Sequence, residues 1–472
     1  MLVNANYQQL PSGTLEGRAE GGDRADTSGL LEQLRERFVR RRRKVEVDFR
    51  QLAHWVRLGD QLTHQIHPYP AKLLPHIAHF FVRASTLSSL GEVVLDPFCG
   101  SGTVALEATL AGRAAYAADA NPLALLVAQV KTRPYDPATL LETLSTLMIR
   151  VRKLRTPLDV AIVNDHIWYA PEKKRVLGRL ARVIEELDCE PLREFFRVCF
   201  SVTARRVSNA DPAISVPVRL KAKSSFGEST SQKVHEKLAW ITSADPIEEF
   251  ERICEANIAR VQATNEAYPQ RQGLEIVGTD ARALKAPENM LAPLRENSVP
   301  LIITSPPYGS AQKYIRASSL SLNWLRLASP EGLSSLEEMS IGREHMPRRW
   351  IADLAADLPR PFELLLSRIE KVNRTRMLIT RQYLHDMRSA FQEMARVIQP
   401  GGHVVLVIGN NQVCGEPLRN DTFSKFIFGE AGLSLELDLI DNIKSRGLMT
   451  KRNKTASMIS RECVLVFKKS CG

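Results

Sequence analysis

Long apolar runs are missing from this chain of 472 residues, and its cysteines are few and scattered. No stretch approaches the roughly 20 consecutive apolar residues of a membrane-spanning helix. The N-terminus lacks the basic, apolar and small-residue pattern of a secretory signal. The seven cysteines form no CxxC pair and no cluster with histidines, so neither a disulfide framework nor a zinc site is expected. We therefore expect reduced thiols, a cytoplasmic location and no metal.

An excess of acidic residues is also missing. The chain has 64 Lys and Arg against 53 Asp and Glu, which gives a formal charge of +11. Such a charge attracts polyanions, nucleic acids among them, but does not identify a partner unless a site that acts on bases accompanies it. Hydrophobic residues make up 44% and charged residues 25%, as in globular proteins. The length predicts a main domain with large insertions or a second domain.

Strands and helices alternate from about residue 91. The apolar segments 92–95 and 114–118 are typical of short strands that each end at an Asp, and helices are expected over 103–111 and 122–130. A strand, a Gly-rich turn, a helix and a strand ending in an acid open a doubly wound α/β domain. Further strands are expected over 274–277, 299–303, 404–408, 433–440 and 463–467, and a helix over 383–398 that Pro400-Gly401-Gly402 ends. The predicted fold is therefore α/β, with a doubly wound Rossmann-like sheet.

The rest of the chain divides by composition. Residues 1–28 are predicted to be a disordered tail, and 29–135 to hold N-terminal helices and the first half of the sheet domain. Residues 136–268 show helical periodicity and few strand candidates, which predicts a helical insertion with a basic loop. The second half of the domain covers 269–472, with an irregular and helical insertion over 309–375.

An N-terminal helix is expected from Leu30 through the basic run at 40–44. That run is either a solvated helix face or an arm that contacts phosphates.

The segment DPFCGSGT at 96–103 is the most specific motif. It follows a predicted strand, where ligands bind in open α/β sheets, and Gly100 and Gly102 allow a tight turn with close approach to a ligand. The whole octapeptide resembles the cofactor-binding motif of S-adenosylmethionine-dependent methyltransferases specific for amino groups. The resemblance implies a methyltransferase sheet whose Gly-rich loop holds the methionine end of S-adenosylmethionine. Cys99 lies inside this loop, and we assign it to packing.

Two acids and one lysine extend the expected cofactor site. Asp119 ends the second strand, where a carboxylate can accept hydrogen bonds from ribose hydroxyls. Asp280 resembles the family's third-strand acid near the adenine, although it could also cap a helix. The segment HPYPAKL at 67–73 resembles a family segment beside the methionine, where Lys72 could contact the carboxylate. The expected cofactor-binding residues are Lys72, Asp96, Phe98, Gly100, Ser101, Gly102, Thr103, Asp119 and Asp280.

The segment TSPPY at 304–308 supplies the expected catalytic residues. An exocyclic amine is a poor nucleophile because its lone pair is delocalised into the ring. Acceptance of its hydrogen bonds by Ser305 and by the Pro306 carbonyl would favour a tetrahedral nitrogen that attacks a methyl donor. Pro306 and Pro307 would hold the turn rigid, and Tyr308 would stack on a base flipped out of the duplex. The segment resembles the family's catalytic SPPY.

The resemblance implies methylation of duplex DNA. Ser at the first position of SPPY is typical of enzymes that act on cytosine N4, whereas Asp or Asn is typical of adenine N6 enzymes. Methylation at cytosine N4 is the leading hypothesis, followed by adenine N6, RNA guanosine N2 and a non-catalytic DNA-binding protein. The resemblance also implies a restriction–modification setting, with a cognate restriction endonuclease as a candidate partner. The insertions at 136–268 and 309–375 are the expected places for target recognition.

Overall fold

The computed structural model describes residues 25–52, 62–70, 72–223, 226–309, 313–343, 357–442 and 461–471. Most of the tail predicted over 1–28 lies outside these residues, and helix α1 begins at Ser28. Within the described part of the chain, no helix is long and apolar enough to cross a membrane. The same part contains no cluster of three or more His, Cys, Asp or Glu side chains suited to a metal ion.

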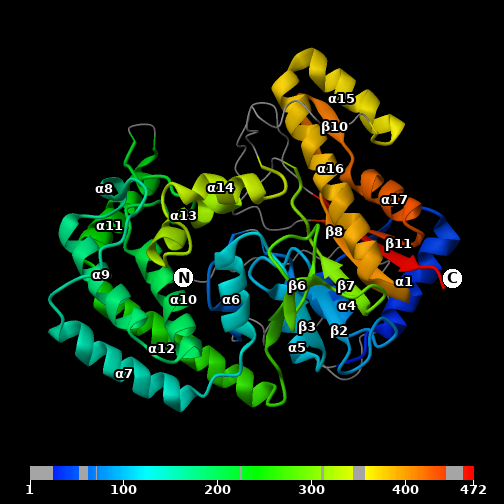
Figure 1. The fold of residues 1–472 in the computed structure, drawn as a ribbon. Coiled ribbons are helices and arrows are strands. Elements are labelled where there is room, and N and C mark those ends of the chain that lie inside the picture. Colours follow the sequence, from blue (N-terminus) through cyan, green and yellow to red (C-terminus); the bar gives the residue numbers. More distant parts are fainter. Residues whose placement is uncertain are drawn as a thin grey trace.

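A twisted sheet forms the centre of the larger lobe (Figure 1). Among the described residues it has eight strands in the order β1-β11-β12-β8-β7-β2-β3-β4. Only β12 in this sheet runs antiparallel to both its neighbours, and the other described pairings are parallel. The strands are β1 (Val45–Val47), β2 (Val93–Asp96), β3 (Ala114–Ala117), β4 (Leu274–Ile276), β7 (Val299–Thr304), β8 (Ile398–Ile408), β11 (Leu433–Asn442) and β12 (Arg461–Lys469).

Both faces of the sheet are buried, which explains why its central strands are continuous apolar runs. In β7, Leu301 and Ile303 pack on one face and Ile302 on the other, as the two-residue period of a strand requires. The first face is covered by α1 (Ser28–Arg41), α2 (Phe49–Leu52), α4 (Pro75–Val82) and α5 (Thr103–Leu110). The second is covered by α15 (Arg360–Val372), α16 (Arg374–Val397) and α17 (Asn420–Glu430). This confirms the doubly wound α/β fold.

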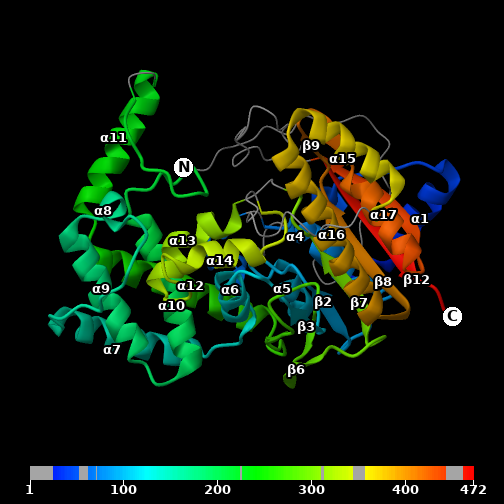
Figure 2. The ribbon, with the colours of Figure 1, turned by 45° about the horizontal axis from the view of Figure 1, so that its top comes forward.

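The predicted helical insertion forms a second lobe beside the sheet (Figures 1 and 2). Its helices are α7 (Pro137–Lys153), α8 (Asp165–Trp168), α9 (Pro171–Glu185), α10 (Glu190–Arg206), α11 (Glu228–Ser243) and α12 (Pro246–Ala267). Helix α11 projects from this lobe in Figure 2 and buries only Ile241 among its described side chains.

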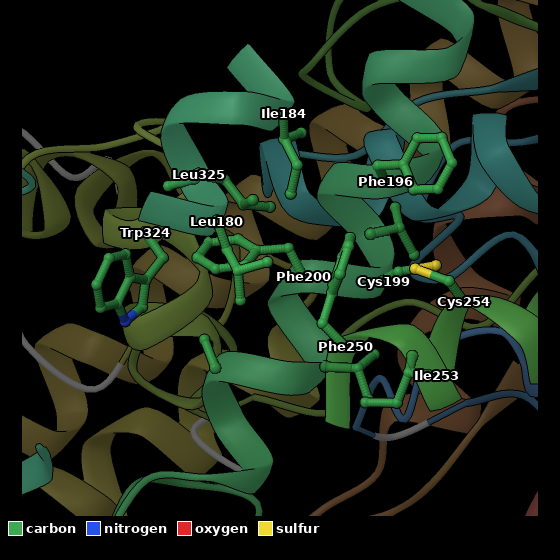
Figure 3. Packing of buried hydrophobic residues seen from close by; sticks show 14 of the residues in the cluster. Leu180, Ile184, Phe196, Cys199, Phe200, Phe250, Ile253, Cys254, Trp324 and Leu325 are labelled. Carbon is green, nitrogen blue, oxygen red and sulfur yellow. The ribbon is translucent and has the colours of Figure 1, made fainter. Parts of the chain in front are cut away.

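The core of this lobe is shared with two other helices, α6 (Pro122–Thr132) and α13 (Tyr314–Trp324). Trp324 packs edge-on against Tyr169 and Phe200, with ring centroids 5.6 Å apart in both pairs. Figure 3 shows Trp324 and Leu325 beside Leu180 and Phe200 of the insertion. The insertion therefore packs against chain from both halves of the sheet domain.

Short elements complete the described fold. They are η2 (Thr63–Gln65), α14 (Gly332–Met339) and two hairpins, β5 (Lys285–Ala286) with β6 (Asn289–Pro293), and β9 (Asn411–Val413) with β10 (Glu416–Leu418).

Three predicted boundaries were wrong. The N-terminal helix ends at Arg41, because Arg42 adopts a left-handed conformation with φ of 49°, and the following residues form β1 at the sheet edge. Helix α16 begins at Arg374, earlier than predicted, because the Asn373 side chain caps the Arg376 amide. It ends at Val397, and Pro400-Gly401-Gly402 lies inside β8, where a register shift opposite Val299 and Leu301 accommodates it.

Candidate active site

The predicted functional segments meet at one edge of the sheet. The strands β2, β3, β4 and β7 are parallel, so their carboxyl ends lie together. DPFCGSGT begins at the last residue of β2, and TSPPY begins at the last residue of β7. Asp119 comes shortly after β3, and Asp280 shortly after β4. Strands β2 and β7 are neighbours in the sheet. After β2 the chain continues to β3 and β4 on one side, and after β7 it continues to β8 on the other side. This is the switch point at which open α/β sheets bind ligands.

A hollow of about 680 Å³, open to solvent, lies at this edge. Six predicted site residues line it: Phe98, Gly100, Asp119, Asp280, Ser305 and Pro307. The structure thus places residues expected to bind the cofactor and residues expected to activate the acceptor amine in one cavity.

The Asp119 carboxylate fixes the Gly-rich loop. Its Oδ2 accepts the Gly100 amide at 2.8 Å and its Oδ1 accepts the Asn121 amide at 2.8 Å. Burial raises the pKa of Asp119 to about 6, against the lowering effect of these two amides. Each carboxylate oxygen has a second lone pair, so Asp119 can still accept hydrogen bonds from a ligand in the hollow.

Both loop glycines have left-handed conformations, with φ of 48° at Gly100 and 72° at Gly102. A Cβ atom on Gly102 would lie 2.6 Å from the Ala128 Cβ atom of helix α6. Glycine at this position therefore allows α5 and α6 to pack closely behind the loop. Cys99 is buried in a small cluster with Ala128, which agrees with its assignment to packing.

Four predicted cofactor residues lie behind the hollow and do not line it: Asp96, Ser101, Gly102 and Thr103. Asp96 accepts the Thr304 hydroxyl at 2.6 Å and the Phe98 amide at 3.1 Å. Burial raises the pKa of Asp96 to about 7, although these two hydrogen bonds lower it. Thr103 begins helix α5. Asp96 holds the start of the loop through these bonds, and the predicted cofactor contacts of the four residues stay predictions.

Ser101 accepts a hydrogen bond from Lys131 Nζ at 3.3 Å. Lys131 is completely buried, and burial, followed by the charge of Lys72, holds its pKa well below the usual value.

Lys72 is not among the residues that line the hollow. Its ammonium group donates to the carbonyls of His67 at 2.7 Å and His64 at 3.3 Å, and burial lowers its pKa to about 8. Its predicted contact with a cofactor carboxylate stays a prediction. The neighbouring Ala71 lies outside the described residues.

Asp280 lines the hollow but is held by an arginine. Its two oxygens lie 2.9 Å from Arg282 Nε and Nη2, and Arg282 Nη1 donates to the buried Asp386 at 2.6 Å. Asp386 also accepts a hydrogen bond from Gln382 at 3.0 Å. The sequence indicated no role for Asp386, which comes near Asp280 only through the packing of α16.

Side chains from distant elements hold the SPPY loop. Asn411 Nδ2 donates to the carbonyls of Tyr308 and Gly309, both at 2.8 Å, and Tyr383 Oη donates to the Pro307 carbonyl at 2.9 Å. These bonds leave out the Pro306 carbonyl, which was predicted to accept from the substrate amine. Pro306 itself is buried. The loop is therefore fixed through the three carbonyls that follow Pro306.

Tyr308 points its hydroxyl group at two polar side chains. Tyr308 Oη donates to Glu462 Oε1 at 2.9 Å, and it lies 3.1 Å from Ser305 Oγ. Burial, followed by the charge of Glu462, raises the pKa of Tyr308 well above its usual value. Glu462 is in β12, 154 residues along the chain, so no local pattern indicated it.

Several lining residues were not predicted. Tyr69 and Asn121 line the hollow and are joined by a 3.0 Å bond from Asn121 Nδ2 to Tyr69 Oη. Tyr69 lies inside the HPYPAKL segment, where an aromatic residue could have been considered. Tyr314 and residues 339–341 also line the hollow. They belong to the insertion at 309–375, whose place against the sheet domain could not be read from the sequence.

These residues fit S-adenosylmethionine. Carboxylates of Asp119 and Asp280 can accept hydrogen bonds from hydroxyl and amino groups. Phe98 offers an apolar surface, and Gly100 brings the backbone to the cavity wall.

Comparison with known proteins agrees with this assignment. Residues 65–134, which include the HPYPAKL segment and the Gly-rich loop, match the family described as RMKL-like, methyltransferase domain. The chain is a methyltransferase, with S-adenosylmethionine as its cofactor.

Two named relatives define the class further. The chain is 27% identical to the Type II methyltransferase M.MvaI of Kocuria varians over 378 residues, which cover 75% of this chain and 78% of the relative. It is 30% identical to the Type II methyltransferase M.MjaII of Methanocaldococcus jannaschii over 144 residues, which cover 28% of this chain and 27% of that protein. Both are homologues of this chain.

Among solved structures, the rRNA methyltransferase AviRa of Streptomyces viridochromogenes covers 89% of this chain and 96% of its own. Its identity is 11% and its TM-score 0.34, an overlap too low to transfer the role of any residue.

Proposed function

We propose that this protein methylates N4 of cytosine in duplex DNA, with S-adenosylmethionine as methyl donor. The observation that carries the proposal is the shared hollow, which Asp119 and Asp280 line together with Ser305 and Pro307. A site of this kind can hold a methyl donor and an amine acceptor side by side, which supplies most of the benefit of proximity.

Cofactor binding is assigned to the wall formed by β2, β3 and β4. Phe98 and Gly100 would contact the cofactor from the first loop, Asp119 would accept from its ribose and Asp280 would lie toward its adenine. When bound, the cofactor supplies an electrophilic methyl group on a sulfonium centre. Asp96 and Ser101 would act indirectly, by holding the loop in the conformation that meets the cofactor.

Amine activation is assigned to the SPPY loop. The Ser305 hydroxyl and the Pro306 carbonyl would accept hydrogen bonds from the two N–H groups, which withdraws the nitrogen lone pair from ring conjugation. The loop can do this without rearranging because Asn411 and Tyr383 hold its later carbonyls. Such preorganisation is a large part of enzymatic rate enhancement. The Tyr308 ring would stack on the target base after it is flipped out of the duplex.

The choice of cytosine N4 rests on Ser305. Ser at this position of the motif is typical of cytosine N4 enzymes in the family that the sequence resembles, whereas adenine N6 enzymes have Asp or Asn.

The choice of DNA is supported by the two Type II relatives and by the formal charge of +11. We assign target recognition to the insertions at 136–268 and 309–375. On the basis of the same two relatives, we also propose a restriction–modification role with a cognate endonuclease as partner.

One candidate contact region lies in the helical insertion. A loop over 209–220 is closed by backbone bonds of 2.8 Å, from Asp211 N to Val218 O and from Leu220 N to Asn209 O. It leads into the exposed Lys221 and Lys223. Lysines on such a loop can contact DNA phosphates, which position the duplex but carry no base information.

The test is product identification. The purified protein is incubated with labelled S-adenosylmethionine and mixed-sequence duplex DNA, with total RNA in parallel, and the digested nucleosides are analysed by mass spectrometry. The Ser305→Ala variant serves as the matched control for contaminating activity. N4-methylcytosine in DNA is the expected product. N6-methyladenine would overturn the assignment from Ser305 but keep the cofactor and the mechanism. Label in RNA alone would overturn the choice of DNA.

A further inference from the structure

Three side chains form a hydrogen-bonded row behind the proposed acceptor site. Ser305 lines the hollow, Tyr308 Oη lies 3.1 Å from Ser305 Oγ, and Glu462 Oε1 lies 2.9 Å from Tyr308 Oη. Ser305 and Tyr308 follow β7, whereas Glu462 is in β12, on the far side of β8. A carboxylate has therefore been brought across the sheet to the hydroxyl of the tyrosine in the catalytic motif.

The direction of each hydrogen bond in this row follows from counting protons. An ionised carboxylate only accepts, and a tyrosine hydroxyl has one hydrogen. When Glu462 is ionised, Tyr308 must donate that hydrogen to it. The Ser305–Tyr308 bond must then use the Ser305 hydrogen, with Tyr308 as acceptor. Ser305 has no hydrogen left for a ligand, and only its lone pairs face the hollow.

We propose that Glu462, acting through Tyr308, fixes Ser305 as a hydrogen-bond acceptor toward the substrate's amino group. This inference rests on the proposed transfer to an exocyclic amine. Glu462 is a positioning residue, since it touches Tyr308 and not the reacting atoms. Without it, Tyr308 can donate to Ser305, and the Ser305 hydrogen can then turn toward the hollow and face the N–H group from which Ser305 should accept.

The row also discriminates between functional groups. An amino group offers hydrogens to Ser305, and a carbonyl oxygen at the same position of a base offers only lone pairs. An acceptor fixed in place repels that oxygen and leaves two acceptors facing each other, which costs binding. The substrate class predicted by this row is therefore a base with an exocyclic amine at the reacting position, and a keto base is excluded from the site.

The charges around Glu462 determine how pH affects the row. Tyr308 faces it from the SPPY loop, Asp441 lies opposite it in β11, and Arg50 of α2 pairs with Asp441 at 3.5 Å. Burial raises the pKa of Glu462, with Tyr308 and Arg50 opposing and Asp441 reinforcing the shift. Protonated Glu462 can donate to Tyr308 and reverse the row. Transfer should therefore decline as the pH falls through this raised pKa.

The test compares kcat at saturating cofactor and nucleic acid for wild type, Tyr308→Phe, Glu462→Met and the double variant. Tyr308→Phe keeps the ring and removes the hydroxyl. Each single variant should lose about tenfold in kcat, the size expected for one hydrogen bond. The double variant should be no slower than the slower single variant, because both break the same row. Cofactor affinity should not change. The matched control is Glu46→Met, which removes an exposed carboxylate from β1.

The pH profile separates this role from a merely structural one. Glu462→Gln cannot titrate, and its amide can donate as well as accept, as protonated Glu462 does. It should therefore have the lowered kcat of the acid form at every pH and lose the acid-side decline in kcat. Three outcomes would overturn the inference. They are a kcat of Tyr308→Phe equal to that of the wild type, a loss of kcat in the double variant equal to the product of the two single losses, and an unchanged acid-side decline in Glu462→Gln. The comparison uses whichever nucleic acid the wild type methylates. Activity on RNA would thus overturn the proposed DNA substrate and still decide the role of Glu462.

Discussion

The Thr304 hydroxyl donates to Asp96 Oδ1 at 2.6 Å, which ties the last residue of β7 to the last residue of β2. These residues are 208 positions apart in the chain. Each is the first residue of one of the two diagnostic segments, DPFCGSGT and TSPPY. The two segments are therefore held in register, and the distance between cofactor loop and acceptor loop is set by buried groups beneath the cavity floor.

Ser305→Ala should lower kcat for methyl transfer by about a hundredfold, the size seen when one positioned hydrogen-bonding group is removed from an active site. Cofactor affinity should stay unchanged, because Ser305 lies on the acceptor side of the hollow. Single-turnover transfer and calorimetric titration of S-adenosylmethionine measure the two quantities. Equal losses of transfer and cofactor affinity in the folded variant would contradict this division of the site.

Asp119→Asn should weaken cofactor binding about tenfold or more, because a hydrogen bond to a charged acceptor is worth about 1.5–3 kcal/mol. The pKa of Asp119 is raised to about 6, so the carboxylate form is present above that pH and is lost below it. Wild-type affinity should therefore fall between pH 7 and 5, while the variant should be less sensitive to pH. Calorimetry at several pH values tests both points. Asp136→Asn, an exposed helix cap, should behave as wild type.

Gly102→Ala should destabilise the fold by about 3 kcal/mol or more. A left-handed conformation costs a non-glycine residue about 1–2 kcal/mol, and overpacking adds about 1–3 kcal/mol. The added methyl group would lie 2.6 Å from the Ala128 Cβ atom. Gly100→Ala is the matched control, since its nearest neighbour would be 3.7 Å away and only the conformational cost applies. Urea unfolding without cofactor gives both values, and similar losses would argue against the close packing of α6.

Lys131→Met should raise the free energy of unfolding at neutral pH. Lys131 is fully buried and its pKa is well below the usual value. The unfolded chain therefore binds a proton at Lys131 more tightly than the folded chain does. Stability therefore rises with pH between the folded and unfolded pKa values. The gain from the substitution should grow as the pH falls from 10 toward 7. Urea unfolding across this range measures it, with the exposed Lys153→Met as control. A destabilised variant at every pH would show that the hydrogen bond from Lys131 to Ser101 outweighs the cost of burying the lysine.

Replacement of Lys221 and Lys223 by Ala should weaken DNA binding and reduce its salt dependence. Each lost phosphate contact lowers the slope of log affinity against log salt by about 0.9, so the double variant should lose about one to two units. Fluorescence anisotropy between 50 and 200 mM salt measures the slope. The double variant of the exposed Lys153 and Arg155 has the same change in charge. An equal effect of both pairs would place DNA contact elsewhere.

The sheet and the loop motifs were predictable because their signals are local. Apolar runs that end at Asp96 and Asp119 predicted β2 and β3 to within a residue or two, and DPFCGSGT predicted the loop between β2 and α5. The helical insertion was also predictable, since a period near 3.6 residues is visible wherever one helix face is buried.

Contacts between distant segments could not be predicted from the sequence. Glu462 and Asn411 hold the SPPY loop from β12 and β9, and nothing in their local sequence differs from that of ordinary surface residues. The backbone partners of Lys72 were likewise not predictable. Its motif indicates a ligand contact, which stays a prediction, and in the fold its ammonium group also donates to two backbone carbonyls of the preceding turn. A residue type indicates its chemistry, whereas only tertiary packing decides which partner it meets.

The shared core of the helical lobe has a consequence for engineering new target specificity. Helices α6 and α13 contribute side chains to that core, and α6 also forms the back of the cofactor loop. A graft that exchanged 136–268 alone would leave the apolar faces of α6 and α13 against a foreign surface, with a loss of cofactor affinity as the first symptom. A transplantable unit would have to include α13, and the side chains of α6 that enter this core would have to be redesigned. A chimera would therefore combine three pieces of chain: 136–268, α13 and a modified α6.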